Sequence, residues 1–116
     1  MSNNARKQIK QESAQRKIKL AQKHQKIAEK TGNKLVEHGK LIQEKNPCFQ
    51  EQGEFIEERG KQINELARIQ EQTLQAAIEK EESLDEFYQL VDKAEQQQLQ
   101  ANQAHTKAIK KYNEII

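Results

Sequence analysis

The chain contains very few residues that interrupt a helix. Its 116 residues include one proline and four glycines, whereas a protein built from β-strands needs a turn signal about every 8 to 12 residues. Charged residues make up 33% of the chain and aromatic residues only 4%, which is typical of solvated helices with a thin apolar stripe. The sequence therefore predicts an all-α fold.

Intrinsic disorder is the alternative to this helical fold. Only 34% of the residues are apolar, and low hydropathy favours disorder. Disordered chains usually also carry a high net charge, whereas the net charge of this chain is only +2. We therefore expect folded helices and keep a disordered chain as the rival interpretation.

Two segments indicate helix boundaries. Asn46 is a favourable residue in front of a helix, and Pro47 fits the first helical position, where its missing N–H loses no hydrogen bond. Residues 83–86 match a capping box, in which a serine and a glutamate satisfy each other's backbone amides. We predict a single helical domain over residues 1–116, with helices at about 5–45, 47–82 and 84–115. The alternative is that the last two helices are continuous.

Apolar residues recur at alternating steps of three and four after Pro47, which is the heptad pattern of helices that pack side by side. The same register runs backwards through Ile42, Leu35 and Ala28. We therefore expect an antiparallel helical hairpin or a three-helix bundle with coiled-coil packing. The predicted seam for a partner helix consists of Phe49, Gln52, Ile56, Ile63, Leu66, Leu84, Phe87, Val91, Tyr112 and Ile115.

Two glycines share one side of the predicted first helix. Gly32 and Gly39 are seven residues apart, a spacing that permits another helix to approach closely. Each glycine also lowers helix propensity by about 1 kcal/mol relative to alanine. We interpret the pair mainly as a local loosening of the helix.

The charges are divided between the two halves of the chain. Residues 1–34 hold ten basic and two acidic residues, a net charge of +8, and residues 47–95 hold thirteen acidic and five basic residues, a net charge of −8. The simplest use of this division is attraction between the first helix and the rest of the chain, which salt would screen.

Five lysines of the basic segment follow helical steps of three and four along one face. They are Lys19, Lys23, Lys26, Lys30 and Lys34. Such a row can follow nucleic-acid phosphates or lie on an anionic bilayer. No aromatic residue precedes Phe49, however, to stack on a base or to anchor in a membrane. We therefore expect a solvated or acid-paired face, with anion binding as the alternative.

No arrangement in the sequence predicts catalysis or metal binding. His24, His38 and His105 lie at no metal-ligand spacing from one another or from Cys48, and a zinc site needs three or four converging ligands. The sequence shows no nucleophile triad, glycine-rich phosphate loop or paired catalytic carboxylates. We therefore expect a non-enzymatic protein without a cofactor or metal.

The sequence also lacks targeting signals. It has no apolar run of signal-peptide or membrane-span length, and its single cysteine cannot form an internal disulfide. We expect a soluble cytoplasmic protein, or one exported without a cleavable signal peptide.

One segment resembles a known family. Residues 52–58 read Gln-Gly-Glu-Phe-Ile-Glu-Glu, with Gln52 on the heptad seam, and they resemble the centre of a Q-type SNARE motif, in particular the syntaxin-like pattern. The resemblance covers about residues 28–80. It implies that Gln52 forms a polar layer in a parallel four-helix bundle, and, because no membrane span follows, that the chain is a soluble partner of fusion bundles. The flanking layers that it implies are Ala28, Leu35, Ile42 and Phe49 before Gln52, and Ile56, Ile63, Leu66, Thr73 and Ala77 after it.

These observations predict a non-enzymatic helical module for protein–protein interaction or assembly that acts through coiled-coil packing. Its partner would be a second copy of the chain or another helical protein, including a SNARE-like bundle. The alternative is a nucleic-acid-binding accessory protein that uses the basic first helix.

Overall fold

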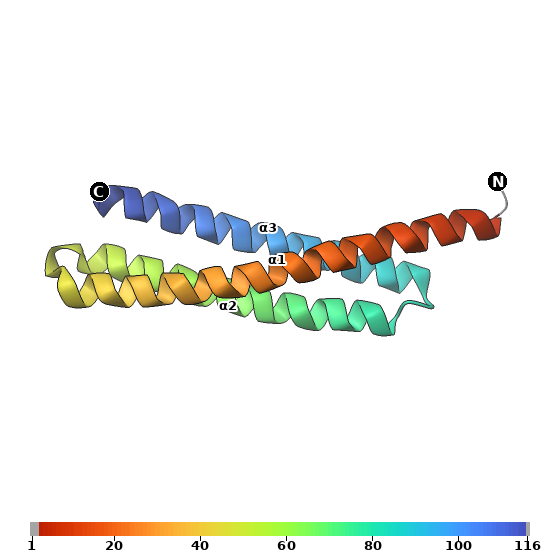
Figure 1. Cartoon of the computed structure of the whole chain (residues 1–116), viewed down its shortest axis with the longest axis horizontal. Helices are drawn as coiled ribbons and strands as arrows, with labels where there is room; N and C mark the ends of the chain where they lie inside the picture. Colours follow the sequence, from red (N-terminus) through yellow and green to blue (C-terminus); the bar gives the residue numbers. More distant parts are fainter. Residues whose placement is uncertain (1–2, 116) are drawn as a thin grey trace.

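The computed structural model describes residues 3–115 and consists of three long helices (Figure 1). Helix α1 covers Asn3–Lys45, a short 3-10 turn, η1, covers Pro47–Phe49, α2 covers Gln50–Glu79 and α3 covers Leu84–Ile115. The described residues contain no strand. The structure therefore confirms the predicted all-α fold, with three helices that pack against one another.

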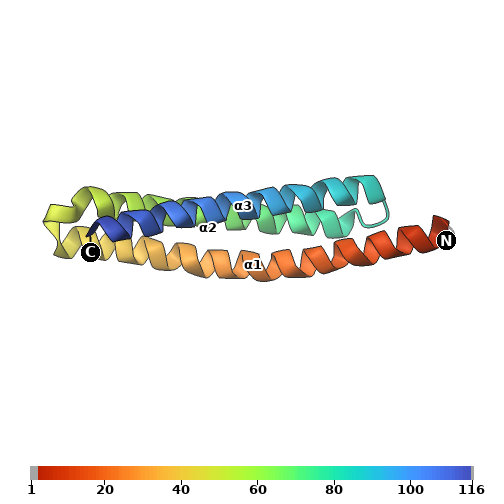
Figure 2. The same cartoon turned by 90° about the horizontal axis from the view of Figure 1, so that it is seen from above.

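The three helices form a narrow rod that measures 65 × 22 × 16 Å. Short connections make consecutive helices antiparallel, so that α1 and α3 run in the same direction (Figures 1 and 2). With 43 residues at about 1.5 Å each, α1 spans the whole rod, and its N-terminal end extends past the turn between α2 and α3 (Figure 2). Helix α2 packs extensively against both neighbours, whereas α1 and α3 touch each other less.

The first helix boundary lies at Asn46 and Pro47. The amide of Asn46 donates to the carbonyl of Ile42 (2.9 Å), and the amide of Phe49 donates to the carbonyl of Asn46 (2.9 Å). Proline occupies the first position of the 3-10 turn, where it needs no hydrogen-bond acceptor. Cys48 is exposed in this turn.

The second boundary lies at Ser83. The carbonyl of Ser83 accepts the first bond of α3 from the amide of Phe87 (2.9 Å), while the amide of Ser83 donates to the carbonyl of Lys80 (3.0 Å). Glu86, the acidic member of the predicted capping box, lies 3.5 Å from the ammonium of Lys80. The chain therefore turns at Ser83, but the amide that Glu86 was expected to accept from is bonded within the turn.

All four glycines lie where α1 contacts α2, and they face one another in two pairs. A Cβ atom built on Gly39 would lie 2.6 Å from the carbonyl oxygen of Gly53, and one built on Gly60 would lie 2.7 Å from that of Gly32. No side chain fits in either place, because real Cβ atoms do not approach backbone oxygens so closely. Our interpretation of Gly32 and Gly39 as a loosening of the helix was wrong: they allow two backbones to touch.

The apolar core consists of two clusters along the rod. The cluster near the α2–α3 turn contains Ala14, Ile18, Leu74, Ala77, Phe87, Val91 and Ala94. The cluster towards the α1–α2 turn contains Ala28, Leu35, Ile56, Ile63, Ala67, Ala104 and Ala108. Many of these residues are alanines, which explains how a chain with few large apolar residues encloses a core.

Buried glutamines, one from each helix, accompany these clusters. Gln25, Gln70 and Gln97 are 6%, 1% and 8% exposed. The amide of Gln25 donates to the carbonyl of Ala67 (3.2 Å), and the amide of Gln70 donates to the carbonyl of Ala94 (3.1 Å). Because a buried amide without a partner is costly, these bonds favour one register of the three helices.

We predict that Gly39→Ala destabilises the fold. The new Cβ would lie 2.5 Å from the amide nitrogen of Glu57 and 2.6 Å from the carbonyl oxygen of Gly53, and neither backbone atom can move without shifting a helix. Overpacking of this kind costs about 1 to 3 kcal/mol, which offsets the gain of about 1 kcal/mol in helix propensity. Chemical denaturation should show a lower free energy of unfolding for Gly39→Ala.

The matched control for this prediction is Glu44→Ala. Glu44 is an exposed residue of the same helix, so its replacement should change the free energy of unfolding by no more than about 0.5 kcal/mol. A Gly39→Ala variant that is more stable than the parent chain would show that the glycines do not hold the helices in contact.

Candidate helix-binding surface

The predicted partner seam is used largely within the chain itself. Ile56, Ile63, Phe87 and Val91 are at most 2% exposed and belong to the core clusters. The other predicted seam residues are half-buried: Phe49, Gln52, Leu66, Leu84, Tyr112 and Ile115. A partner would reach the four core residues only if the bundle opened.

The buried face of α2 differs from the predicted seam at two of the four seam residues in this helix. The seam includes Gln52 and Leu66, but the fully buried residues are the neighbouring Gly53 and Ala67. The prediction selected Leu66 for its size, whereas close contact with α1 requires small residues. The recurrence of small residues at steps of seven, from Gly53 through Gly60 and Ala67, was the signal that could have revealed this face.

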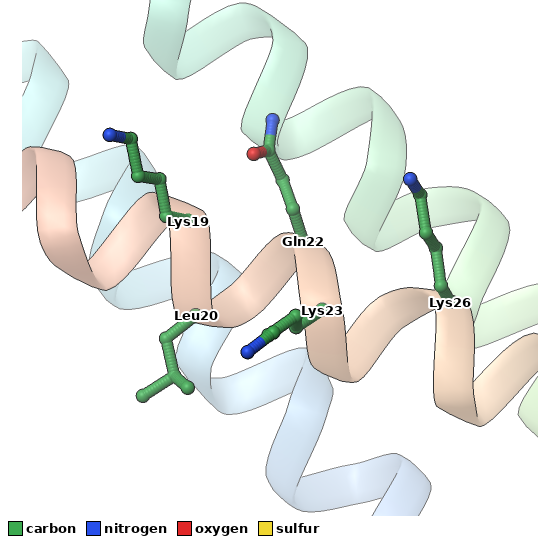
Figure 3. A pocket seen from close by; sticks show the side chains of 5 residues that line it. All are labelled: Lys19, Leu20, Gln22, Lys23 and Lys26. Carbon is green, nitrogen blue, oxygen red and sulfur yellow. The ribbon is translucent and has the colours of Figure 1, made fainter.

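The five predicted anion-binding lysines are all exposed on α1. Figure 3 shows Lys19 and Lys26 on one side of the helix, and Leu20 and Lys23 on the other. Lys26 borders a hollow with Glu71 of α2, whereas Leu20 borders one with residues of α3. The hollow between Lys19 and Lys26 has walls from α1 alone, so the lysine row forms an open surface and not a pocket.

Direct ion pairs account for little of the expected attraction between α1 and the acidic part of the chain. In the described residues, Lys17 and Glu95 form the one ion pair that joins α1 to another helix, at 3.6 Å. Both side chains are about half exposed, and such pairs contribute about 0 to 1 kcal/mol. The side-chain amides of Gln11 and Gln15 also donate to the carboxylate of Glu81 near the α2–α3 turn.

A groove runs between α1 and α3. Of the three pairs of long helices, this pair has the least contact. One part of it, of about 130 Å³, is lined by Lys17, Leu20, Ala21, His24, Glu95 and Gln98. The adjoining part, of about 80 Å³, is lined by His24, Ile27, Ala28, Thr31, Ile63, Gln98, Ala101, Asn102 and His105. Because the two parts share His24 and Gln98, we treat them as one surface and call it the α1–α3 groove.

Exposed apolar residues flank this groove. Leu20 and Ile27, which are 56% and 59% exposed, belong to its α1 wall. Leu99, which is 57% exposed, borders a hollow whose walls come from α3 alone, and it lines neither part of the groove. At steps of seven residues, which return to the same side of a packed helix, the exposed residues Leu41 and Ile109 continue the rows of Ile27 and Asn102.

All three histidines lie on this side of the bundle. His24 and His105 line the α1–α3 groove from opposite walls. Further along, the Nδ1 atom of His38 lies 2.8 Å from the hydroxyl oxygen of Tyr112, and the two rings meet edge to face at 6.2 Å. This contact joins α1 to α3 beyond the groove. Within residues 3–115, no three His, Cys, Asp or Glu side chains lie in a group that could hold a metal ion.

The partial burial of Tyr112 should make stability fall at high pH. Burial raises the pKa of Tyr112 above its ordinary value of 10.0, so the folded state favours the neutral phenol. The stabilisation from the buried neutral phenol is complete at pH values below the pKa of Tyr112 in the unfolded chain. It is lost as the pH rises through the higher pKa of Tyr112 in the folded chain. An ultraviolet titration should show a late-ionising phenol that Tyr112→Phe removes and Tyr88→Phe retains. Persistence of the late phenol in Tyr112→Phe would contradict this assignment.

None of the three helices in the described range contains a segment long and apolar enough to cross a membrane. Gln52, at the centre of the SNARE-like resemblance, is half-buried near the start of α2, and the resemblance itself stays a prediction. A scan against protein-family models, a search of curated proteins and a search of solved structures found no match to this chain.

Proposed function

We propose that this chain is a non-enzymatic interaction module that binds a partner helix in the α1–α3 groove. One observation carries the proposal. Seven large apolar residues in the described part of the chain are exposed, and four of them, Leu20, Ile27, Leu41 and Ile109, lie in the seven-residue rows that pass through the groove walls. Exposed apolar side chains that gather in one place, rather than being scattered, are typical of interaction sites.

The geometry of the groove suits a helix. Leu20 and Ile27 are exposed apolar residues of its α1 wall, and Leu41, beyond the groove, continues their row at a multiple of seven residues. An amphipathic helix packs its own heptad-spaced apolar residues against such rows. Covering one of these half-exposed side chains contributes about 1 kcal/mol, so four of them support a reversible contact.

The α1–α3 groove is also accessible without unfolding. A partner that used Phe87 or Val91 would have to displace α1 or α2, because both residues are nearly completely buried. A helix in the groove leaves the core intact and produces a four-helix arrangement. The SNARE-like resemblance of residues 52–58 implies a different, parallel four-helix bundle, whereas α2 runs antiparallel to α1 and α3 (Figures 1 and 2). We include a SNARE-like bundle among the partners that the proposal allows only as a source of a helix for the groove.

Nucleic-acid binding is the second candidate function. It is favoured by the five exposed lysines of α1, none of which forms an ion pair with a described carboxylate. A row of unpaired cations attracts phosphates in any sequence context. Lys19 and Lys26 project from one side of the helix and Lys23 from the other, however (Figure 3), so these three do not form a single straight strip along a phosphate backbone.

The proposal predicts that a tethered helix docks in the groove. We would fuse a neutral 21-residue amphipathic helix, with leucine at heptad core positions and Gln or Ala elsewhere, to residue 116 through a flexible linker. Its docking should raise the melting temperature by at least about 4 °C, because 1 kcal/mol corresponds to about 4 to 8 °C in a domain of this size. Circular dichroism melting measures the change.

Two substitutions provide the controls. Ile27→Asp on the groove wall should abolish the rise, whereas Ile78→Asp should not, because Ile78 is an exposed apolar residue of α2 on neither wall. An equal rise in the Ile27→Asp fusion, or no rise in the parent fusion, would refute docking in the α1–α3 groove. Sedimentation of each fusion excludes a rise caused by self-association.

A further inference from the structure

We propose that two copies of this chain exchange their third helices, with α2 and α3 of each copy joined into one continuous helix. The turn between these helices, residues 80–83, reads Lys-Glu-Glu-Ser and contains neither Gly nor Pro. No residue in the described range has a positive φ angle, so the turn uses no left-handed conformation that a helix excludes. The other turn, by contrast, contains Pro47, which cannot continue a preceding helix. The turn at residues 80–83 is therefore the one that can straighten.

The core rows of α2 continue into those of α3 across this turn. Both rows advance by seven residues. Their members are Ile56, Ile63, Gln70, Ala77, Leu84 and Val91 in the first row, and Thr73, Lys80, Phe87, Ala94 and Ala101 in the second. All of them are buried or half-buried except Lys80 in the turn. Two helices joined by a turn need not share a heptad phase, whereas a continuous helix in a coiled coil keeps one. The shared phase favours a form in which residues 50–115 are one helix of about 100 Å.

A second copy is the partner that such a straightened helix requires. Straightening removes α3 from its own hairpin and uncovers Phe87 and Val91, which are at most 2% exposed in the bundle. A two-fold axis at the straightened turn places α3 of each copy antiparallel to α2 of the other, which is the orientation within one chain (Figures 1 and 2). The contacts between α3 and the hairpin are then remade between copies, while the glycine pairs of α1 and α2 stay within each copy.

Straightening also provides acceptors for backbone amides at the turn. Among the described residues, the amides of Glu82, Leu84, Asp85 and Glu86 donate to no backbone carbonyl, as is usual at the start of a helix. A continuous helix offers each of these amides the carbonyl four residues earlier. The exchanged form therefore gains backbone hydrogen bonds that the single bundle lacks.

The N-terminal end of α1 gains a neighbour in the exchanged dimer. Gln11 and Gln15 contact Glu81 in the turn, and the end of α1 before them extends past the turn (Figure 2). Residues 3–10 hold three basic and no acidic residues, whereas residues 79–86 hold five acidic residues and one lysine. These acidic residues repel one another in a continuous helix. In the dimer the second copy continues the rod beyond the turn, so the basic ends of α1 lie near the acidic segments and offset this repulsion.

The exchange changes how the α1–α3 groove is built. The groove takes His24 from α1 and His105 from α3, so in the dimer each groove has one wall from either copy, and two grooves are present. The inference goes beyond the proposed function, because a partner helix fits the groove of the single bundle and that of the dimer alike. A dimer offers such partners two linked sites, which raises the overall affinity for a bivalent partner.

Spin labels measure the exchange directly. In a Cys48→Ser background, Glu65→Cys and Gln100→Cys carry the labels at exposed positions, which lie at nearly the same level of the rod because Gln70 contacts Ala94. The rod is 22 × 16 Å across, so the labels stay close in a single bundle. In the exchanged dimer they are separated by about 50 Å along one helix.

We would dilute labelled chains with unlabelled ones, unfold and refold the mixture at about 1 mM, the effective concentration that a short tether provides, and isolate the dimer by size exclusion. Double electron–electron resonance should then show the long distance within one chain. A dimer that keeps the short distance, or a chain that stays monomeric at this concentration, would overturn the inference.

Two matched double substitutions locate the effect in the turn. Glu82→Ala with Ser83→Ala favours the continuous helix, whereas Glu82→Gly with Ser83→Gly disfavours it, because glycine is the weaker helix former. The dimer contains two such turns, so its association constant should be at least about tenfold higher for the Ala pair than for the Gly pair. Circular dichroism at low concentration checks that both variants fold. Equal association of the two variants would refute exchange through the turn.

The outcomes also separate this inference from the proposed function. If the tethered neutral helix fails to dock but the long distance is found, the proposed function is refuted and the exchange stands. If the tethered helix docks and the labels stay close in every species, the function stands and the exchange is refuted.

Discussion

The contact between the glycines of α1 and those of α2 is the constraint on which the rest of the bundle depends. Gly39 and Gly53 each lie seven residues from Asn46, Gly32 and Gly60 each lie fourteen, and Gln25 and Ala67, which share a hydrogen bond, each lie twenty-one. The hairpin therefore closes symmetrically about its turn, one heptad at a time. Because two backbones touch at the glycine pairs, a shift of the register would put side chains where none fits.

The close contact between α1 and α2 determines how α3 packs in the bundle. With α1 and α2 pressed together, α3 packs mainly on α2, where the amide of Gln70 reaches the carbonyl of Ala94. Helix α3 meets α1 through polar contacts such as Lys17 with Glu95 and His38 with Tyr112. The unequal packing leaves the α1–α3 groove between them, and Leu20 and Ile27 are exposed on its α1 wall. The candidate binding surface is thus a consequence of the tight hairpin on the opposite side of α1.

The sequence predicted the parts of this structure that depend on local chemistry. The all-α class followed from the shortage of Pro and Gly, and both breaks lie where Pro47 and Ser83 indicate them. Position within the core was harder to predict. The heptad search favoured large side chains, so it found Ile56 and Ile63 but chose Leu66 beside the buried Ala67. The groove was beyond sequence reasoning, because the exposure of Leu20 and Ile27 depends on how far apart α1 and α3 lie.

The most direct test of this account is the pairing of the glycines in solution. The chain has only four glycines, so their Hα resonances can be assigned and followed in a three-dimensional nuclear Overhauser experiment. The account predicts cross-peaks between Gly39 and Gly53 and between Gly32 and Gly60, with none between Gly32 and Gly53. Random-coil shifts without these cross-peaks, or a different set of glycine pairs, would contradict the tight hairpin and with it the groove on its far side.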